Sequence, residues 1–386
     1  AQVRSFAGEA SRTPKICGED FAGLPSASST AARPSSTPRH GAGDPFMGPA
    51  AATWPEADLR ARLPLRDPIA VRGRVLVTGA SGLLGRQVLR ILRADGWEVR
   101  GLCFSRLAVA EGLVVCDLSV EGAAARQVED FQPYAVVHLA AEWRPEALRR
   151  SPARTRRLNV DAAGSVAAAC QRCGAWLIYL SADGVFDGRA APYSVDAVAN
   201  PLSEYGWHKL HGEQLTLVAC PRAAVLRVAL LYGPCDSTID SAVTSLHADL
   251  MKGVREVDAW QRCYPTWAPD VAGVIAAMLR RHSLGEGASL RGIFHWQGSE
   301  RYTWHQMMLA VAELTGFHAD EIYAVHAPSA VTPLPRDTQL DCSRLEAALG
   351  MAELAQLRTP FREGLRRCLV PLVAAQLGAA LRAQGD

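Results

Sequence analysis

A short apolar run followed by three regularly spaced glycines constrains this chain more than any other feature. Val75-Leu76-Val77 is typical of a buried strand, and residues 83–94 carry apolar side chains at helical spacing. Between them runs Thr78-Gly79-Ala80-Ser81-Gly82-Leu83-Leu84-Gly85, a G-x-x-G-x-x-G spacing. A strand, a glycine loop and a helix in this order predict the first unit of a parallel α/β sheet that binds a dinucleotide at the helix N-terminus.

Each glycine of this loop has a separate expected role. Gly79 permits the tight turn out of the strand, Gly82 lets the backbone approach a pyrophosphate, and Gly85 lets the helix pack closely on the sheet. The helix N-terminus adds free N–H groups and the positive end of the helix dipole. The cofactor contacts predicted from this loop are Thr78, Gly79, Ser81, Gly82, Leu83, Leu84 and Gly85.

The alternation of strands and helices continues well beyond the loop. Further strands are predicted at 97–103, 113–116, 135–139, 176–180 and 224–231, and helices at 121–131, 157–170 and 203–218. This alternation predicts an α/β fold: a Rossmann doubly wound parallel sheet with helices on both faces.

Three regions follow from these patterns. Residues 1–70 are rich in Ala, Ser, Pro, Gly and Arg and are too poor in core-forming residues to offset their ordering entropy. They are interpreted as a low-complexity extension, either a leader remnant or a partner-wrapping arm, with Met47 as an alternative start. Residues 71–235 are the predicted dinucleotide-binding domain. Residues 236–386 are predicted to form a smaller mixed C-terminal lobe, with a strand near 292–296 returning to the sheet.

The end of the second predicted strand bears on the choice of dinucleotide. An NAD site usually has an acid there, whereas this chain has Ser105 and Arg106, which suit the 2′-phosphate of NADP. A solvated loop arginine is the alternative. Asp117 and Leu118, after the third strand, are expected to meet the adenine ring. Ala140-Ala141, after the fourth, is expected to allow close backbone approach.

A Y-x-x-x-K pattern supplies the candidate chemistry. Tyr205 and Lys209 are four residues apart on a predicted helix, so the two side chains share one face. A nearby ammonium stabilises a phenolate, which would let Tyr205 act as general acid or base, while Lys209 binds the nicotinamide ribose. A reductase of this kind also needs a hydroxyl that donates to the substrate carbonyl.

The run Ser181–Gly188, S-A-D-G-V-F-D-G, resembles the S-[ST]-D-Y-V-F-D-G segment of the dTDP-4-dehydrorhamnose reductase family. Within this family of extended short-chain dehydrogenases/reductases, the chain resembles most the regulatory beta subunits of methionine adenosyltransferase. The likeness covers about residues 72–370 and implies that Asn159 also contacts the cofactor. Other matching runs are His138–Glu142, Leu158–Ala162, Tyr264–Thr266, Phe294–Trp296 and Gln339–Ser343.

Two departures from the family pattern affect the expected activity. The family's catalytic Ser/Thr falls on Ala182, and its Tyr two positions later falls on Gly184. Ser181 is not a simple substitute, because neighbouring strand residues face opposite sides. Loss of one oxyanion donor costs on the order of 10²–10³ in rate. Carbonyl reduction is therefore expected to be slow or absent, while NADP still binds, and Tyr205 and Lys209 are vestigial.

Three functions remain open at this point. The first is a non-catalytic or weakly catalytic NADP-binding regulatory subunit, which the resemblance pairs with the catalytic subunit of methionine adenosyltransferase. The second is an active NADPH-dependent reductase of a nucleotide-linked keto-sugar. The third is an accessory subunit of a larger organellar assembly such as respiratory complex I. The resemblance implies a cytoplasmic location, whereas a leader remnant in residues 1–70 would imply a mitochondrion or another organelle.

Composition excludes several other classes of function. A net charge of +2 gives no strong field toward nucleic acid or anionic lipid. No run of 18 apolar residues predicts a membrane span. Cys170 and Cys173 form a C-x-x-C without a second pair at zinc-site spacing, so they are interpreted as a structural pair and no metal site is expected.

Overall fold

A computed structural model describes residues 73–104, 113–329 and 333–385, with side chains up to residue 376. Its centre is a seven-stranded sheet in the order β10-β6-β5-β4-β1-β2-β3, in which all neighbours run parallel. The strands are β1 Arg74–Thr78, β2 Glu98–Cys103, β3 Leu113–Val115, β4 Ala135–His138, β5 Trp176–Ala182, β6 Ala224–Val228 and β10 Gly292–Trp296. The predicted α/β Rossmann fold is confirmed.

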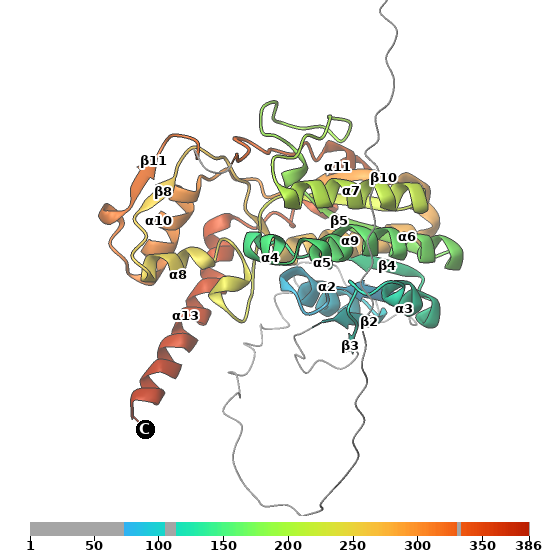
Figure 1. The fold of residues 1–386 in the computed structure, drawn as a ribbon, viewed down its shortest axis with the longest axis horizontal. Helices are drawn as coiled ribbons and strands as arrows, with labels where there is room; N and C mark the ends of the chain where they lie inside the picture. Colours follow the sequence, from blue (N-terminus) through green and yellow to red (C-terminus); the bar gives the residue numbers. More distant parts are fainter. Residues whose placement is uncertain (1–72, 105–112, 330–332, 386) are drawn as a thin grey trace, which may run out of the picture. The chain divides into compact units, whose positions relative to one another are not determined.

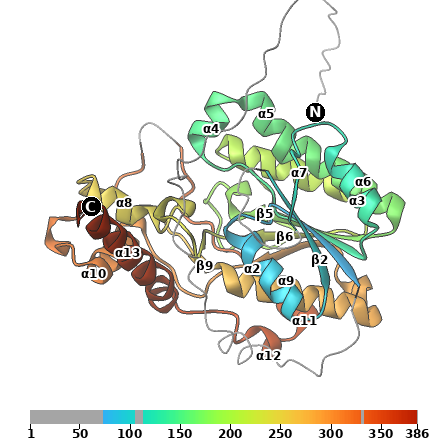
Figure 2. The ribbon, with the colours of Figure 1, turned by 90° about the horizontal axis from the view of Figure 1, so that it is seen from below.

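Helices cover both faces of this sheet (Figures 1 and 2). On one face lie α2 Leu83–Ala94, α9 Ala268–Arg281, α11 Ser343–Leu349 and α12 Met351–Leu354. On the other lie α3 Ala123–Phe131, α6 Ala162–Cys173 and α7 Glu204–Ala219. Because strand side chains alternate between faces, the run at 75–77 sends Val75 and Val77 to the first core and Leu76 to the second.

A third core lies away from the sheet, in the part of the chain at the left of Figure 1. It is built from α8 Ser245–Met251, α10 Trp304–Thr315 and α13 Phe361–Gly385, with the two-stranded pair β8 Glu256–Asp258 and β11 Tyr323–Val325. A capping box begins α10, because Thr303 and Gln306 each accept the other's backbone N–H. The strand predicted near 292–296 is β10, which pairs with β6 at the sheet edge. The domain boundary predicted at residue 235 stays a proposal. Three elements beyond it, α9, α11 and β10, belong to the sheet and its covering layer.

Two predicted elements differ from the structure. The helix expected at 157–170 begins earlier, as α5 Pro152–Arg156, and passes through a π-helical turn at 157–161 into α6. Proline at the first helical position favours such a start, since its missing N–H would be unpaired there. The strand expected at 224–231 is two strands, because β7 Leu231–Tyr232 leaves the sheet and pairs with β9 Thr266–Trp267.

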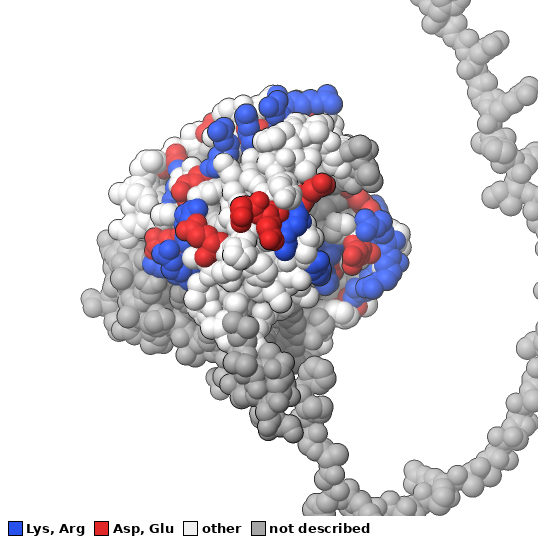
Figure 3. Space-filling view, turned by 90° about the vertical axis from the view of Figure 1, so that its left-hand side faces the viewer, with Lys and Arg blue, Asp and Glu red and all other residues white. Residues whose placement is uncertain are grey.

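No helix within the described ranges is long and apolar enough to cross a membrane. The face formed by the part of the chain around α8, α10 and β11 carries acidic and basic side chains interspersed with uncharged surface (Figure 3). This mixture agrees with the small net charge of the chain.

Candidate functional site

The glycine loop lies between β1 and α2 and packs against the end of β4. Gly79 has a φ of +65°, and a Cβ there would lie 2.8 Å from the Ala140 nitrogen. A Cβ on Gly85 would overlap the Gly79 carbonyl oxygen. Both positions therefore need glycine, one for its backbone conformation and its close neighbour, the other for the approach of the helix to the loop.

The N-terminus of α2 has the properties of an anion site. The first N–H groups of any helix lack intrahelical acceptors. In α2 no side chain caps them at Gly82, and the first turn carries no acid. A Cβ on Gly82 would meet only the Gly79 oxygen within 4 Å, at 3.2 Å. The backbone at this point is thus open to a ligand, and the arrangement fits the pyrophosphate of a dinucleotide. Leu83 and Leu84 follow in the first turn, with Leu84 in the core beneath.

Thr78 joins the ends of two central strands. Its Oγ1 accepts the N–H groups of Leu139 and Ala140 at 3.1 and 3.2 Å, and lies 2.8 Å from Nδ1 of His138. With both N–H donors directed at it, the hydroxyl has its own proton to donate to His138. Burial, together with the nearby Lys209 charge, lowers the pKa of His138 to about 3, so the ring is neutral. This link fixes the start of the 139–142 loop that borders the glycine loop.

Asn159 secures the other end of that loop. Its Oδ1 accepts the Glu142 N–H and its Nδ2 donates to the Glu142 carbonyl, both at 2.8 Å. Asn159 is buried at the π-helical turn, where Nδ2 also lies 3.3 Å from His208 Nδ1. Asn159 thus holds the backbone at Glu142, the last residue of the loop that contains Ala140 and Ala141, and its contact with a cofactor stays a prediction.

The residues predicted near the adenosine half are only partly described. Ser105 and Arg106 lie outside the described residues, so the NADP prediction at that position has no structural account. The Asp117 carboxylate accepts from the N–H and hydroxyl of Ser119, at 2.9 and 2.7 Å, and from Arg154 at 3.2 Å. Leu118 is buried in the core. Their contact with an adenine ring stays a prediction.

Tyr205 and Lys209 project from α7, whose N-terminus is capped by the Ser203 hydroxyl. The Lys209 ammonium is buried, with Nζ 4.3 Å from the centre of the Tyr179 ring on β5. Small residues bring the helix this close, because a Cβ on Gly206 would overlap the Gly184 carbonyl and one on Gly212 the Tyr179 hydroxyl. The predicted helix and its pair of functional groups thus lie over the carboxyl end of the sheet.

The protonation of this pair does not favour a phenolate. Burial raises the pKa of the Tyr205 hydroxyl, and the nearby Asp183 carboxyl adds to the rise. Burial lowers the pKa of the Lys209 ammonium to about 7, while the Glu213 carboxylate opposes that fall. Burial also raises the pKa of Asp183 to about 6, opposed by the hydrogen bond that Thr338 donates at 2.6 Å. Lys209 is therefore only partly charged at neutral pH.

A pH effect on stability follows from Lys209. Its pKa is about 7 in the folded chain against 10.5 for an ordinary lysine, so the unfolded chain binds a proton that the folded chain lacks between these values. Stability contributed by this position is therefore expected to rise as pH rises from about 7 to about 10. Urea unfolding of the wild type and Lys209→Met across that range measures it. A constant difference between the two free energies would contradict it.

The position of the lost hydroxyl lies at the end of β5. Ala182 is half-buried there, and a Cβ on Gly184 would meet nothing within 4 Å. Ser181 is fully buried, and among the described residues its hydroxyl has no hydrogen-bond partner. Strand alternation places the Ser181 side chain on the opposite face from Ala182. Residue 182 therefore supplies no hydroxyl at the end of β5, and a side chain at position 184 would enter open space.

Several polar groups near this site were missed by the sequence reasoning. Arg86 on α2 bonds the Ser81 carbonyl and pairs with Asp236, and Glu213 pairs with Arg227 beneath Lys209. An arginine within the apolar run 224–228 was the available signal for the second pair, since a buried charge needs a partner. Cys170 and Cys173 are free thiols, and no cluster of three metal-ligating side chains occurs within the described ranges.

Residues 73–373 match the family model of the RmlD substrate binding domain. The chain is 38% identical to methionine adenosyltransferase 2 subunit beta of Xenopus tropicalis, over 80% of this chain and 91% of the relative. It is 31% identical to dTDP-4-dehydrorhamnose reductase of Streptomyces griseus, over 76% of this chain and 93% of the relative. The fold matches a dTDP-4-dehydrorhamnose reductase of Bacillus anthracis solved in complex with NADP, with a TM-score of 0.61, 23% identity, and coverage of 78% of this chain and 99% of the other.

Proposed function

Because the chain belongs to the RmlD substrate-binding-domain family, we propose that it is an NADP-binding regulatory subunit that has lost most of its reductase chemistry. The observation that supports this is the contrast between two neighbouring parts of the site. The cradle of Gly79, Gly82 and Gly85 is intact and open to phosphate. The carbonyl-binding side beside Tyr205 has alanine where a hydroxyl is required.

The residues that would hold NADP come from five places in the chain. The glycine loop and the α2 N-terminus bind the pyrophosphate, Ala140 and Ala141 line the path of the cofactor, and Lys209 binds the nicotinamide ribose. Ser105 and Arg106 are proposed to hold the 2′-phosphate. NADPH, when bound, would supply a hydride to a substrate carbonyl. Without a hydroxyl at residue 182, this site would stabilise the resulting negative charge only weakly. The proposed role of the cofactor is therefore to set the conformation of the subunit.

The proposed partner is the catalytic subunit of methionine adenosyltransferase. The similarity to the beta subunits spans about nine-tenths of their length, so it is not limited to one shared motif. Purified chain mixed with that catalytic subunit is expected to elute as one complex in size-exclusion chromatography. Separate elution at micromolar concentrations would overturn the partner, and recovery of the chain in a membrane-bound respiratory assembly would favour the accessory-subunit reading.

A substitution in the cradle tests cofactor binding directly. Gly79→Ala places a Cβ against the backbone of Ala140 and is expected to weaken NADP binding by at least about tenfold, since the loop must shift where phosphate binds. Titration calorimetry with NADP measures the change. Gly174→Ala is the matched control: its φ of +71° imposes similar backbone strain, but its Cβ would meet nothing within 4 Å. Equal losses in both variants would contradict the role of Gly79.

A further inference from the structure

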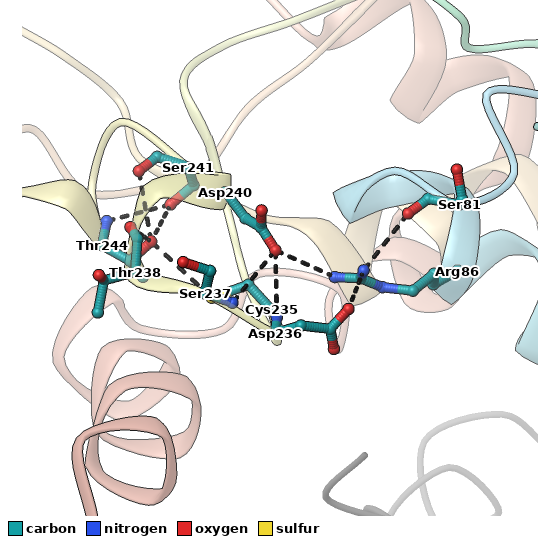
Figure 4. Close-up of polar contacts among 9 residues, drawn as sticks. All are labelled: Ser81, Arg86, Cys235, Asp236, Ser237, Thr238, Asp240, Ser241 and Thr244. Atoms are coloured by element: carbon teal, nitrogen blue, oxygen red, sulfur yellow. Dashed lines mark hydrogen bonds and ion pairs between the residues drawn. The ribbon is translucent and has the colours of Figure 1, made fainter. Parts of the chain in front are cut away.

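Arg86 connects the glycine loop to a distant segment of the chain (Figure 4). Its Nη1 donates to Asp236 Oδ2 at 2.6 Å and to the Ser81 carbonyl at 3.3 Å. Its Nη2 lies 3.8 Å from Asp240 Oδ2. Nη2 is shielded from solvent and makes no hydrogen bond, so part of the donor capacity of this guanidinium is unused.

The acidic side of this contact is a built unit and not a loose loop. Asp240 has a side chain only 3% exposed, and its Oδ2 accepts the N–H groups of Asp236 and Ser237. The bond from Ser237 belongs to a capping box between Ser237 and Asp240. The Thr244 hydroxyl donates to the Thr238 carbonyl at 2.7 Å, and the Thr244 N–H donates to the Ser241 hydroxyl. We call residues 236–244 the acidic segment. It leads directly into α8, whose Leu246 and Leu250 belong to the core away from the sheet.

The direction of the Arg86 side chain places its charge near the proposed phosphate site. Helix side chains lean toward the helix N-terminus, and the contact with Ser81 shows that this guanidinium does so. A pyrophosphate at the α2 N-terminus would bring negative charge close to Arg86, and also toward the carboxylates of Asp236 and Asp240. Without a cation between them, these like charges would oppose one another. A guanidinium with unused N–H groups can bridge both.

We propose that Arg86 is a positioning residue that couples occupancy of the glycine-loop cradle to the ordering of the acidic segment and α8. The inference rests on the proposed binding of NADP and adds the regulation of that same site. Cofactor phosphate draws the Arg86 side chain into a shared network with Asp236 and Asp240, and the acidic segment is held more firmly as a result. Cofactor binding is thereby communicated from the sheet to the core around α8 and α10.

Hydrogen exchange of the full chain with and without NADP tests this coupling. In the wild type, NADP is expected to slow exchange at residues 79–90 and, by at least about fivefold, at 236–251, the lower end of usual coupling factors. In Arg86→Met, saturating NADP still protects 79–90, but the effect at 236–251 disappears. Arg86→Lys keeps the charge and is expected to retain part of it. Asp236→Asn removes the shorter contact from the other side and serves if Arg86→Met does not fold.

The outcomes separate the two proposals. Absence of NADP protection at 79–90 in the wild type overturns the cofactor proposal, and the coupling with it. Protection at 79–90 without protection at 236–251 overturns the coupling alone, as does protection at 236–251 that persists in Arg86→Met. Arg172→Met, which breaks an exposed ion pair with Glu129 on the surface, is the control for loss of an arginine and is expected to leave both responses unchanged.

Discussion

Replacing Ala182 by threonine is expected to raise NADPH-dependent reduction of dTDP-4-dehydrorhamnose by about 10²–10³-fold over the unmodified chain. The physical reason is the developing negative charge on the substrate carbonyl, which a hydroxyl at the end of β5 would stabilise in the transition state. Tyr205 and Lys209, the proposed acid–base pair, both lie on α7. Oxidation of NADPH, followed by its absorbance, measures the rate.

Ala182→Val is the matched control for this experiment, because valine has the shape of threonine without its hydroxyl. An equal gain with valine would show that packing, and not a hydrogen-bond donor, limits the reaction. A wild-type rate as high as that of Ala182→Thr would overturn the proposed loss of reductase chemistry. Adding Gly184→Tyr fills space that the structure leaves open beside Asp183, so the double variant shows whether that space also limits turnover.

The sheet was predictable because its central strands are buried on both faces. A parallel strand in that environment is a nearly continuous apolar run, as at 75–77 and 135–139, and the run is visible without any partner. The strand at 224–231 was harder, since an apolar run does not show where the chain leaves one sheet for another. Leu231 continues the pattern but pairs with Thr266 in a separate sheet.

The candidate site was predictable only where one residue type implies one task. Glycines at fixed spacing and Tyr205 with Lys209 on one helix face meet that condition. The contacts that Thr78, Asn159 and Arg86 make do not, because their partners lie 17 to 154 positions away and only the fold brings them together. Asn159 looks like a cofactor ligand in a matching run, yet its amide is engaged by the Glu142 backbone.

Arg227→Met is expected to reduce the free energy of unfolding by about 3–5 kcal/mol. Arg227 and Glu213 have side chains only 3% and 2% exposed, joined by two parallel bonds of 2.8 and 2.7 Å. Methionine keeps the bulk of the side chain but leaves the Glu213 carboxylate buried without its guanidinium. Urea unfolding at neutral pH measures the loss.

The double variant Arg227→Met with Glu213→Leu separates lost packing from an unpaired charge. It is expected to recover most of the stability, since replacing both partners of a buried pair by apolar residues is often neutral. Arg172→Met breaks an exposed pair with Glu129 and is expected to cost at most about 1 kcal/mol.

Glu213 also lies one turn beyond Lys209 on α7 and raises the pKa of Lys209. Freed from Arg227, Glu213 should hold Lys209 in its charged form, so the rise in stability between about pH 7 and about pH 10 should shrink in Arg227→Met. An unchanged pH profile together with full loss of stability would show that the pair supports the fold without influencing Lys209.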